Sequence, residues 1–96
     1  MWGMGAPLKY AGMTDLKWAL TERKQIRFIC SGVHYTAEPH GMFNDPRSRS
    51  FVVSCYILEG PGTGTWRDFR YAHLREMEVL RDSFAPRQRH FSLAPL

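Results

Sequence analysis

The order of apolar and polar residues predicts one short helix followed by a series of strands. Thr14 is a suitable N-cap residue, and a helix is expected from there to about Arg23. Its apolar positions recur at helical spacing and are Leu16, Ala19 and Leu20. This helix is amphipathic enough to cover one open end of a sheet, and Trp18 is expected to pack rather than to hold a ligand. Residues 24–30 then alternate with a period of two and predict the first strand.

Two more strands are predicted after the first. Residues 31–32 form a Ser-Gly turn signal, and residues 33–43 are a second extended segment. This segment should bend at the Glu-Pro-His-Gly sequence of residues 38–41, because proline cannot donate to a ladder and glycine permits a bulge. After a polar loop at residues 44–50, residues 51–58 form the most apolar strand, which we expect at the centre of the sheet.

The stretch 65–74 combines the strongest strand signal with the densest cluster of ligand-capable side chains. It predicts a fourth strand over residues 65–71 and a corner at residues 72–74. The glycine-rich connection before it, at residues 60–64, lacks the Lys-Ser/Thr of a phosphate loop. Residues 76–84 fit a last strand or a helix equally well on periodicity, and helix propensity alone favours a helix.

These elements predict a mainly β protein with one N-terminal helix, folded as a small five-stranded closed barrel of the SH3 or Sm-like kind. A chain of 96 residues is long enough for one such domain with a small core. The domain is expected over residues 14–84, after a flexible N-terminal segment at residues 1–13 and before a basic, irregular tail at residues 85–96. Closure would also remove the exposed sheet edges.

Composition adds a mild basic surplus and a default location. The formal charge is +4, from 13 Lys and Arg against 9 Asp and Glu, and Arg outnumbers Lys by ten to three. Because Arg favours planar recognition of anions, this balance is compatible with nucleic acid or another anionic ligand. Cys30 and Cys55 lie in apolar runs and are expected to be buried thiols, although a bridge between neighbouring strands stays open. No apolar run reaches about 20 residues, so we expect no membrane contact and a cytoplasmic location.

The side chains around residues 65–74 favour an anion site. Arg and aromatic side chains suit phosphates and stacked bases, as in single-stranded nucleic acid. Strand alternation would place Trp66 and Arg70 on one face and Arg67 and Phe69 on the other, so not all of them can serve one site. The alternative is that Trp66 packs on the helix and the arginines form solvated ion pairs with nearby acidic residues. The candidate ligand-binding residues are Arg67, Arg70, His73, Arg75, His40 and Tyr56.

Neither metal binding nor catalysis is predicted. The cysteines and histidines could supply ligands, but none falls into a zinc spacing such as Cys-x-x-Cys or His-x-x-x-His. No residues form a recognisable set of nucleophile, base and orienting group. We therefore expect no metal site, no cofactor and no catalytic residue, and a protein that is not an enzyme.

With the strands placed, the ordered motifs over about residues 16–84 resemble the WYL domain of bacterial transcriptional regulators. That family opens with a helix and an aliphatic-aromatic strand and continues with an extended segment ending in Glu-Pro. A Trp-Tyr-Leu strand, an Arg-x-Phe-Arg run with a corner, and a final segment closing on Phe follow. The corresponding residues here are Ala19-Leu20 with Ile26-Arg27-Phe28-Ile29, Glu38-Pro39-His40-Gly41-Met42, Phe51-Val52-Val53, Arg67-Asp68-Phe69-Arg70 with His73-Leu74, and Phe84.

The resemblance implies an Sm-like SH3 barrel with a strand in its last segment. It also implies a sensor role, in which a nucleic acid fragment or a nucleotide-like anion binds the barrel and alters an attached DNA-binding domain. Because residues 1–13 are too few for a helix-turn-helix, we expect a standalone sensor in transcriptional or defence regulation, acting through a DNA-binding partner or as a homodimer. The alternative, from another class, is a protein-interaction module whose exposed strand aromatics mediate homodimerisation without a ligand.

Overall fold

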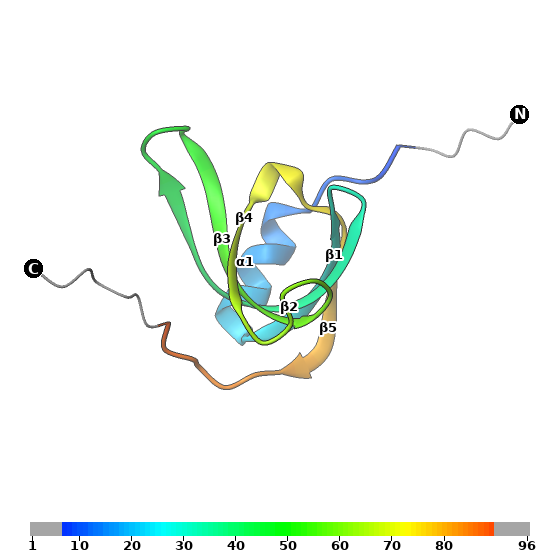
Figure 1. The fold of residues 1–96 in the computed structure, drawn as a ribbon, viewed down its shortest axis with the longest axis vertical. Helices are drawn as coiled ribbons and strands as arrows, with labels where there is room; N and C mark the ends of the chain where they lie inside the picture. The colour runs from blue at the N-terminus through cyan, green and yellow to red at the C-terminus, as the bar shows by residue number, and fades with distance from the viewer. Residues whose placement is uncertain (1–6, 90–96) are drawn as a thin grey trace, which may run out of the picture.

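One antiparallel sheet of five strands and one α-helix make up the fold of residues 7–89, the part that this computed structural model describes (Figure 1). A mainly β protein with one N-terminal helix is therefore confirmed. The strands lie in the order β4-β3-β2-β1-β5, so the last strand returns to the first. The elements are α1 (Met13–Glu22), β1 (Lys24–Cys30), β2 (Val33–Asp45), β3 (Ser50–Glu59), β4 (Trp66–Arg70), the 3-10 helix η1 (Tyr71–His73) and β5 (Arg75–Ser83).

The sheet is curled but not closed, which corrects the expected barrel. Among residues 7–89, β4 pairs only with β3, and β5 pairs with β1 and with a short N-terminal piece. In that piece, Tyr10 forms an antiparallel bridge with Arg75, so the edge of β5 is already paired at its first residue, directly after η1. Ala11 is buried in the core, its amide donates to the Leu74 carbonyl, and the Lys9 carbonyl accepts from the Glu76 amide. Residues 9–11 of the expected flexible lead-in are therefore held at the start of β5, while the side chains of Leu8 and Tyr10 are exposed. The remainder of the predicted N-terminal segment and tail, residues 1–6 and 90–96, lies outside the described residues.

Strand β2 lies at the centre of the sheet, and the expectation that residues 51–58 would do so is wrong. With 13 residues, β2 is long enough to pair with β1 through its first part and with β3 through the rest. Its register against β3 shifts between Pro39 and Gly41, which leaves His40 as an extra residue. The predicted bend is therefore a bulge at His40, where one extra residue interrupts the alternation of β2.

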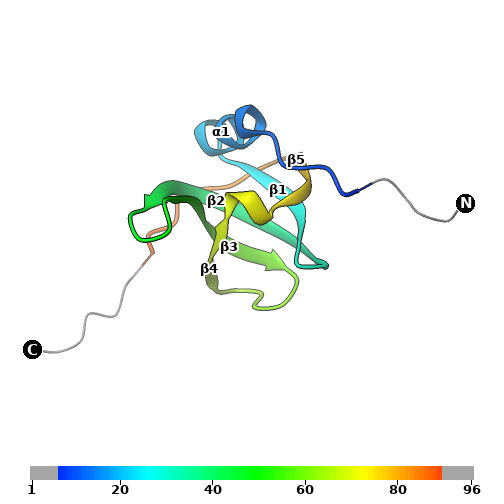
Figure 2. The same ribbon diagram turned by 90° about the horizontal axis from the view of Figure 1, so that it is seen from above.

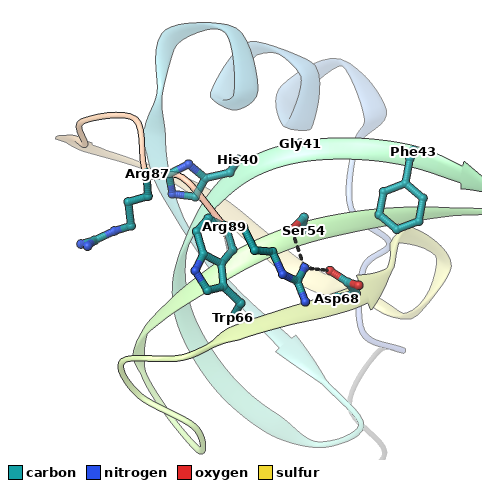
Figure 3. A pocket seen from close by; sticks show the side chains of 8 residues that line it. All are labelled: His40, Gly41, Phe43, Ser54, Trp66, Asp68, Arg87 and Arg89. Carbon is teal, nitrogen blue, oxygen red and sulfur yellow. Dashed lines mark hydrogen bonds and ion pairs between the residues drawn. The ribbon is translucent and has the colours of Figure 1, made fainter. Parts of the chain in front are cut away.

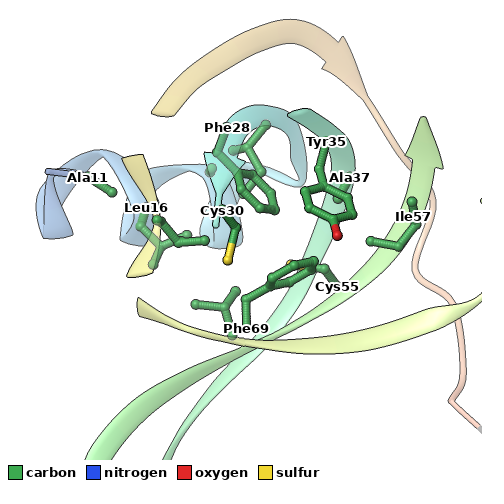
Figure 4. Close-up of a cluster of buried hydrophobic side chains, with 13 residues drawn as sticks. Ala11, Leu16, Phe28, Cys30, Tyr35, Ala37, Cys55, Ile57 and Phe69 are labelled. Atoms are coloured by element: carbon green, nitrogen blue, oxygen red, sulfur yellow. The ribbon is translucent and has the colours of Figure 1, made fainter. Parts of the chain in front are cut away.

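The core lies between the curled sheet and the helix (Figure 4). Its centre is a ring cluster in which the Phe28 centroid lies 5.6 Å from that of Tyr35 and 4.9 Å from that of Phe69. Phe69 thus belongs to the fold, as its alternation predicted. Cys30 and Cys55 are buried free thiols, so the open question of a bridge is settled for these two residues. Strand β5 shows that the ambiguous last segment is a strand, because pairing with β1 overrides its helix propensity.

Helix α1 covers one end of the curled sheet, against β1, β2 and β5, as predicted (Figure 2). Leu16 and Ala19 form its buried stripe. The N-cap is Gly12 rather than Thr14, because the Gly12 carbonyl accepts the first helical hydrogen bond from the Leu16 amide at 3.0 Å. Trp18 lies off the buried stripe and is 51% exposed, so the expectation that it packs is wrong.

The connection between β3 and β4 is a tight turn rather than a flexible loop. The Thr63 amide donates to the Gly60 carbonyl at 3.2 Å, and the Gly64 amide donates to the Ile57 carbonyl at 2.8 Å. Gly60 has a φ of 111°, a conformation that only glycine adopts readily. This turn brings β4 back along β3 and so places Trp66 and its neighbours on the sheet.

Replacing Gly60 with Ala should destabilise the fold more than the same change at Gly32. A Cβ at Gly60 would lie 2.7 Å from the His34 carbonyl oxygen, whereas a Cβ at Gly32 meets nothing within 4 Å. Both residues have positive φ, so we expect a loss in unfolding free energy of about 1 kcal/mol for G32A and about 2–4 kcal/mol for G60A. Chemical denaturation measures both, and equal losses would contradict the close approach of this turn to β2.

Candidate ligand-binding site

A cavity of about 360 Å³ opens on the face of β2, β3 and β4 that points away from the core (Figure 3). It brings together aromatic rings, two guanidinium groups and one carboxylate from three strands and the C-terminal segment. The lining residues are His40, Gly41, Phe43, Ser54, Trp66, Asp68, Arg87 and Arg89.

The floor of the cavity follows from the strand register. Residues directly opposite each other on paired strands share a face, and every second residue returns to that face. Three rows of side chains therefore cross β2, β3 and β4 on this outer face. They are row 1 (Glu38, Tyr56, Trp66), row 2 (Gly41, Ser54, Asp68) and row 3 (Phe43, Val52, Arg70).

The C-terminal segment supplies the two guanidinium groups of the cavity. Arg87 reaches row 1, where its Nε and Nη2 donate to the Glu38 carboxylate at 2.6 and 3.2 Å and its guanidinium lies 3.9 Å from the Tyr56 ring centroid. Arg89 reaches row 2, where its Nη1 donates to Asp68 Oδ1 at 2.5 Å and to Ser54 Oγ at 2.9 Å. The segment thus lies over the sheet with one arginine on each row.

His40, the bulged residue of β2, is held between two aromatic rings. Its ring centroid lies 4.8 Å from that of Trp66 and 4.7 Å from that of Phe84. Its Nε2 lies 2.9 Å from Glu38 Oε1 and completes the surroundings of that carboxylate. His40 lies two residues after Glu38, so alternation places it on the same outer face, and the bulge then puts Gly41 on that face as well.

Glu38 is the buried charge of the site, with only 4% of its surface exposed. Burial by itself would raise the pKa of this carboxyl group, because desolvation disfavours the charged form. The hydrogen bonds from Arg87 and His40, together with their positive charges, outweigh burial and hold the pKa of Glu38 below its ordinary value. Glu38 is therefore an ionised acceptor at neutral pH, and Arg87 is fixed to it.

Two of the six predicted ligand residues lie at this cavity. His40 lines it, and Tyr56 lies beneath Arg87 with its ring 5.6 Å from that of Trp66. Trp66 packs on these two rings, so the alternative that it packs on the helix does not hold. Arg67 points to the core side of β4, where it donates to the Tyr35 hydroxyl at 2.7 Å. Its environment is that of a structural arginine at the rim of the core.

The other three predicted residues lie elsewhere, so the six do not converge on one surface. Arg70 is exposed on row 3, beyond the residues that line the cavity. His73 and Arg75 line a separate cavity of about 320 Å³ together with Ser31 and Gly32. Arg75 is also held by its own corner, because its Nη1 donates to the Leu74 carbonyl at 3.0 Å and its guanidinium lies 4.0 Å from the Tyr10 ring centroid.

Arg87 and Arg89 are the functional candidates that sequence analysis missed. The tail has no apolar periodicity, and it was therefore expected to be irregular and basic. Two features could have indicated its position. The arginines are two residues apart and so lie on one side of an extended chain, and the carboxylate of Glu38 lies within a strand, where burial would require a cation beside it.

The described residues offer little for metal or thiol chemistry. Within residues 7–89, no group of three His, Cys, Asp or Glu side chains could hold a metal ion. Burial and the nearby Asp68 carboxylate raise the pKa of the Cys55 thiol well above its ordinary range, so it is a thiol rather than a thiolate at neutral pH. None of the helices in this part of the chain is long and apolar enough to cross a membrane.

Comparison with known proteins returns no relative: no family model, no curated protein and no solved structure matches the chain.

Acid should weaken the fold through Glu38. Because the folded-state pKa of Glu38 lies below its ordinary value of 4.5, the carboxylate contributes fully above that value. Its contribution is lost as the pH falls through the lowered folded-state pKa. We expect E38Q to melt roughly 5 °C or more below the wild type at pH 7, and the difference to shrink as the pH falls below 4.5.

Thermal unfolding followed by circular dichroism at a series of pH values measures this difference. E59Q is the matched control, because Glu59 is an exposed carboxylate at the end of β3. Its melting temperature should follow the wild type at every pH. A difference between E38Q and the wild type that does not shrink as the pH falls below 4.5 would contradict the lowered pKa.

Proposed function

We propose that this chain is a ligand-sensing regulatory domain that binds a nucleotide-like anion, either free or at the end of a single strand, in the outer-face cavity. The observation that carries the proposal is the juxtaposition of Trp66 and Phe43 with the guanidinium groups of Arg87 and Arg89 around one opening (Figure 3). Aromatic faces next to arginines are what a stacked base with an attached phosphate requires.

The size and shape of the cavity favour a single nucleotide over a duplex. Its volume of about 360 Å³ lies within the range of small-ligand sites. Phe43 is 48% exposed and Trp66 is half-buried, so both offer ring surface for stacking. One stacked base is worth roughly 1–3 kcal/mol, which gives affinity without a demand for a particular base.

Arg89 is the arginine expected to turn to a phosphate. Its partner Asp68 has a side chain that is 39% exposed, so water can solvate that carboxylate when the arginine leaves it. The side chain of Glu38 is only 5% exposed, so water cannot solvate its carboxylate in the same way if Arg87 leaves. A phosphate therefore competes with Asp68 for Arg89, while Arg87 stays on Glu38 and holds the segment in place.

The proposal extends to the family and the regulatory setting. The order β4-β3-β2-β1-β5 supports an Sm-like arrangement in an open form, because only a meeting of β4 and β5 would close it. Together with the resemblance to WYL domains, this supports a role in transcriptional or defence regulation through a DNA-binding partner.

A second candidate function, homodimerisation without a ligand, is favoured by the hairpin of β2 and β3. This hairpin projects from the rest of the sheet (Figure 1), and it carries Phe43 and Phe51 at 48% and 45% exposure. Exposed aromatics near a hairpin end suit a protein contact.

Mononucleotides and short single-stranded oligonucleotides should quench Trp66 fluorescence in a W2F/W18F background at low salt. Phosphate contacts release counterions, so the affinity should fall steeply as salt is raised. R89Q should weaken binding at least tenfold. R47Q removes the same charge from the exposed loop between β2 and β3 and should leave binding within about twofold. No quenching at low salt, together with a concentration-dependent mass, would favour homodimerisation instead.

Arg70 is tested separately, because it shares row 3 with Phe43 but does not itself line the cavity. R70A should reduce anion binding through lost long-range attraction while the melting temperature stays nearly unchanged. Fluorescence titration and thermal unfolding of the same sample measure both quantities. Unfolding of R70A would show that the residue is structural.

A further inference from the structure

The C-terminal segment lies on the sheet without joining it. Its last backbone hydrogen bond among the described residues runs from the Phe84 amide to the Arg23 carbonyl at 2.9 Å. Beyond it, the side chains of Arg87 and Arg89 contact the sheet, and residues 85–88 are exposed. A segment held in this way can leave the sheet without breaking a ladder.

The spacing of the arginines matches the spacing of their sites on the sheet. In an extended chain, Arg87 and Arg89 lie roughly 6.6 Å apart along the backbone. On β3, row 1 contains Tyr56 and row 2 contains Ser54, and these residues are also two positions apart. The distance between the two rows along the strand therefore equals the distance between the two arginines along an extended chain. The outer face is therefore complementary to an extended Arg-x-Arg sequence.

The first of these sites is built into the fold and needs a cation. Glu38 is buried in the central strand, where an ionised carboxylate without a charged partner is costly. His40 supplies one contact, but the planar two-point contact comes from an arginine, as does the stacking on Tyr56. Glu38 and Asp68 together balance the charge of two guanidinium groups. The sheet thus forms a receptor of which the arginine segment is the occupant.

We propose that the outer-face cavity is a docking site for the Arg-x-Arg segment of a second copy of this chain. The segment of the second copy would replace the segment that belongs to the same molecule as the cavity. The second copy carries residues that are known to fit, because the cavity already holds their equivalents. In an isolated molecule the tethered segment prevails, since a short tether gives it an effective concentration in the millimolar range. Exchange places Arg87 and Arg89 of one copy in the cavity of another. It requires no nucleotide and does not depend on the function proposed above.

Two complementary variants of the full chain test the exchange. The receptor variant R87Q/R89Q keeps the cavity and lacks its own arginines, and the donor variant E38Q/D68N keeps the arginines and lacks the acidic partners. Each alone should sediment as a monomer of 11.2 kDa. An equimolar mixture, without nucleotide, should form a one-to-one dimer of twice that mass. A mixture that stays monomeric would overturn the proposal.

A synthetic peptide of residues 84–89 provides a second measurement that does not require the donor variant to fold. It should bind R87Q/R89Q with saturation, change Trp66 fluorescence and raise the melting temperature. A peptide with Lys in place of both arginines keeps the charge but lacks the planar fork, and it should bind at least tenfold more weakly. Equal binding of the two peptides, or binding that survives E38Q in the receptor, would contradict recognition of arginine by this cavity.

Discussion

A buried carboxylate in the middle of the central strand organises the outer face of this protein. Glu38 lies beside a bulge in β2, and its negative charge must be compensated from above the sheet. His40 and Arg87 supply this compensation, and each of them positions other groups of the site. His40 orders Trp66 and Phe84 around its ring, and Arg87 places the C-terminal segment over row 1. The cavity exists because these groups meet at one acid.

The proline and glycine on either side of His40 give this arrangement its geometry. Pro39 is buried, where it donates no hydrogen bond, and β2 pairs with β3 on both sides of the register shift that follows it, while β1 pairs only with the part of β2 before the bend. On the inner face of the sheet, the rings of Phe28, Tyr35 and Phe69 pack on one another. Neighbouring residues before the bulge therefore serve both faces, since Ala37 belongs to the core and Glu38 to the outer-face site.

The sequence was informative wherever a structure depends on neighbours along the chain. Alternation located β1 and β3, and the Glu-Pro-His-Gly signal located the bulge, because these features follow from local sterics. Closure of the sheet and the identity of its central strand depend on which edges meet, and the pairing of Tyr10 with Arg75 has no periodic signal. The site was harder still. His40 and Tyr56 could be named, but Arg87 and Arg89 reach the outer face from 21 to 49 positions further along the chain than their partners.

The two edge strands of the sheet, β4 and β5, limit backbone pairing with other chains. Strand β4 is short, and three of its five residues, Arg67, Asp68 and Arg70, are charged, while β5 is capped at one end by the N-terminal piece. Short charged edges disfavour addition of a foreign strand, the route by which β proteins assemble into fibrils. Growth by backbone pairing is thus discouraged along β4 and at the start of β5, where the N-terminal piece is already paired.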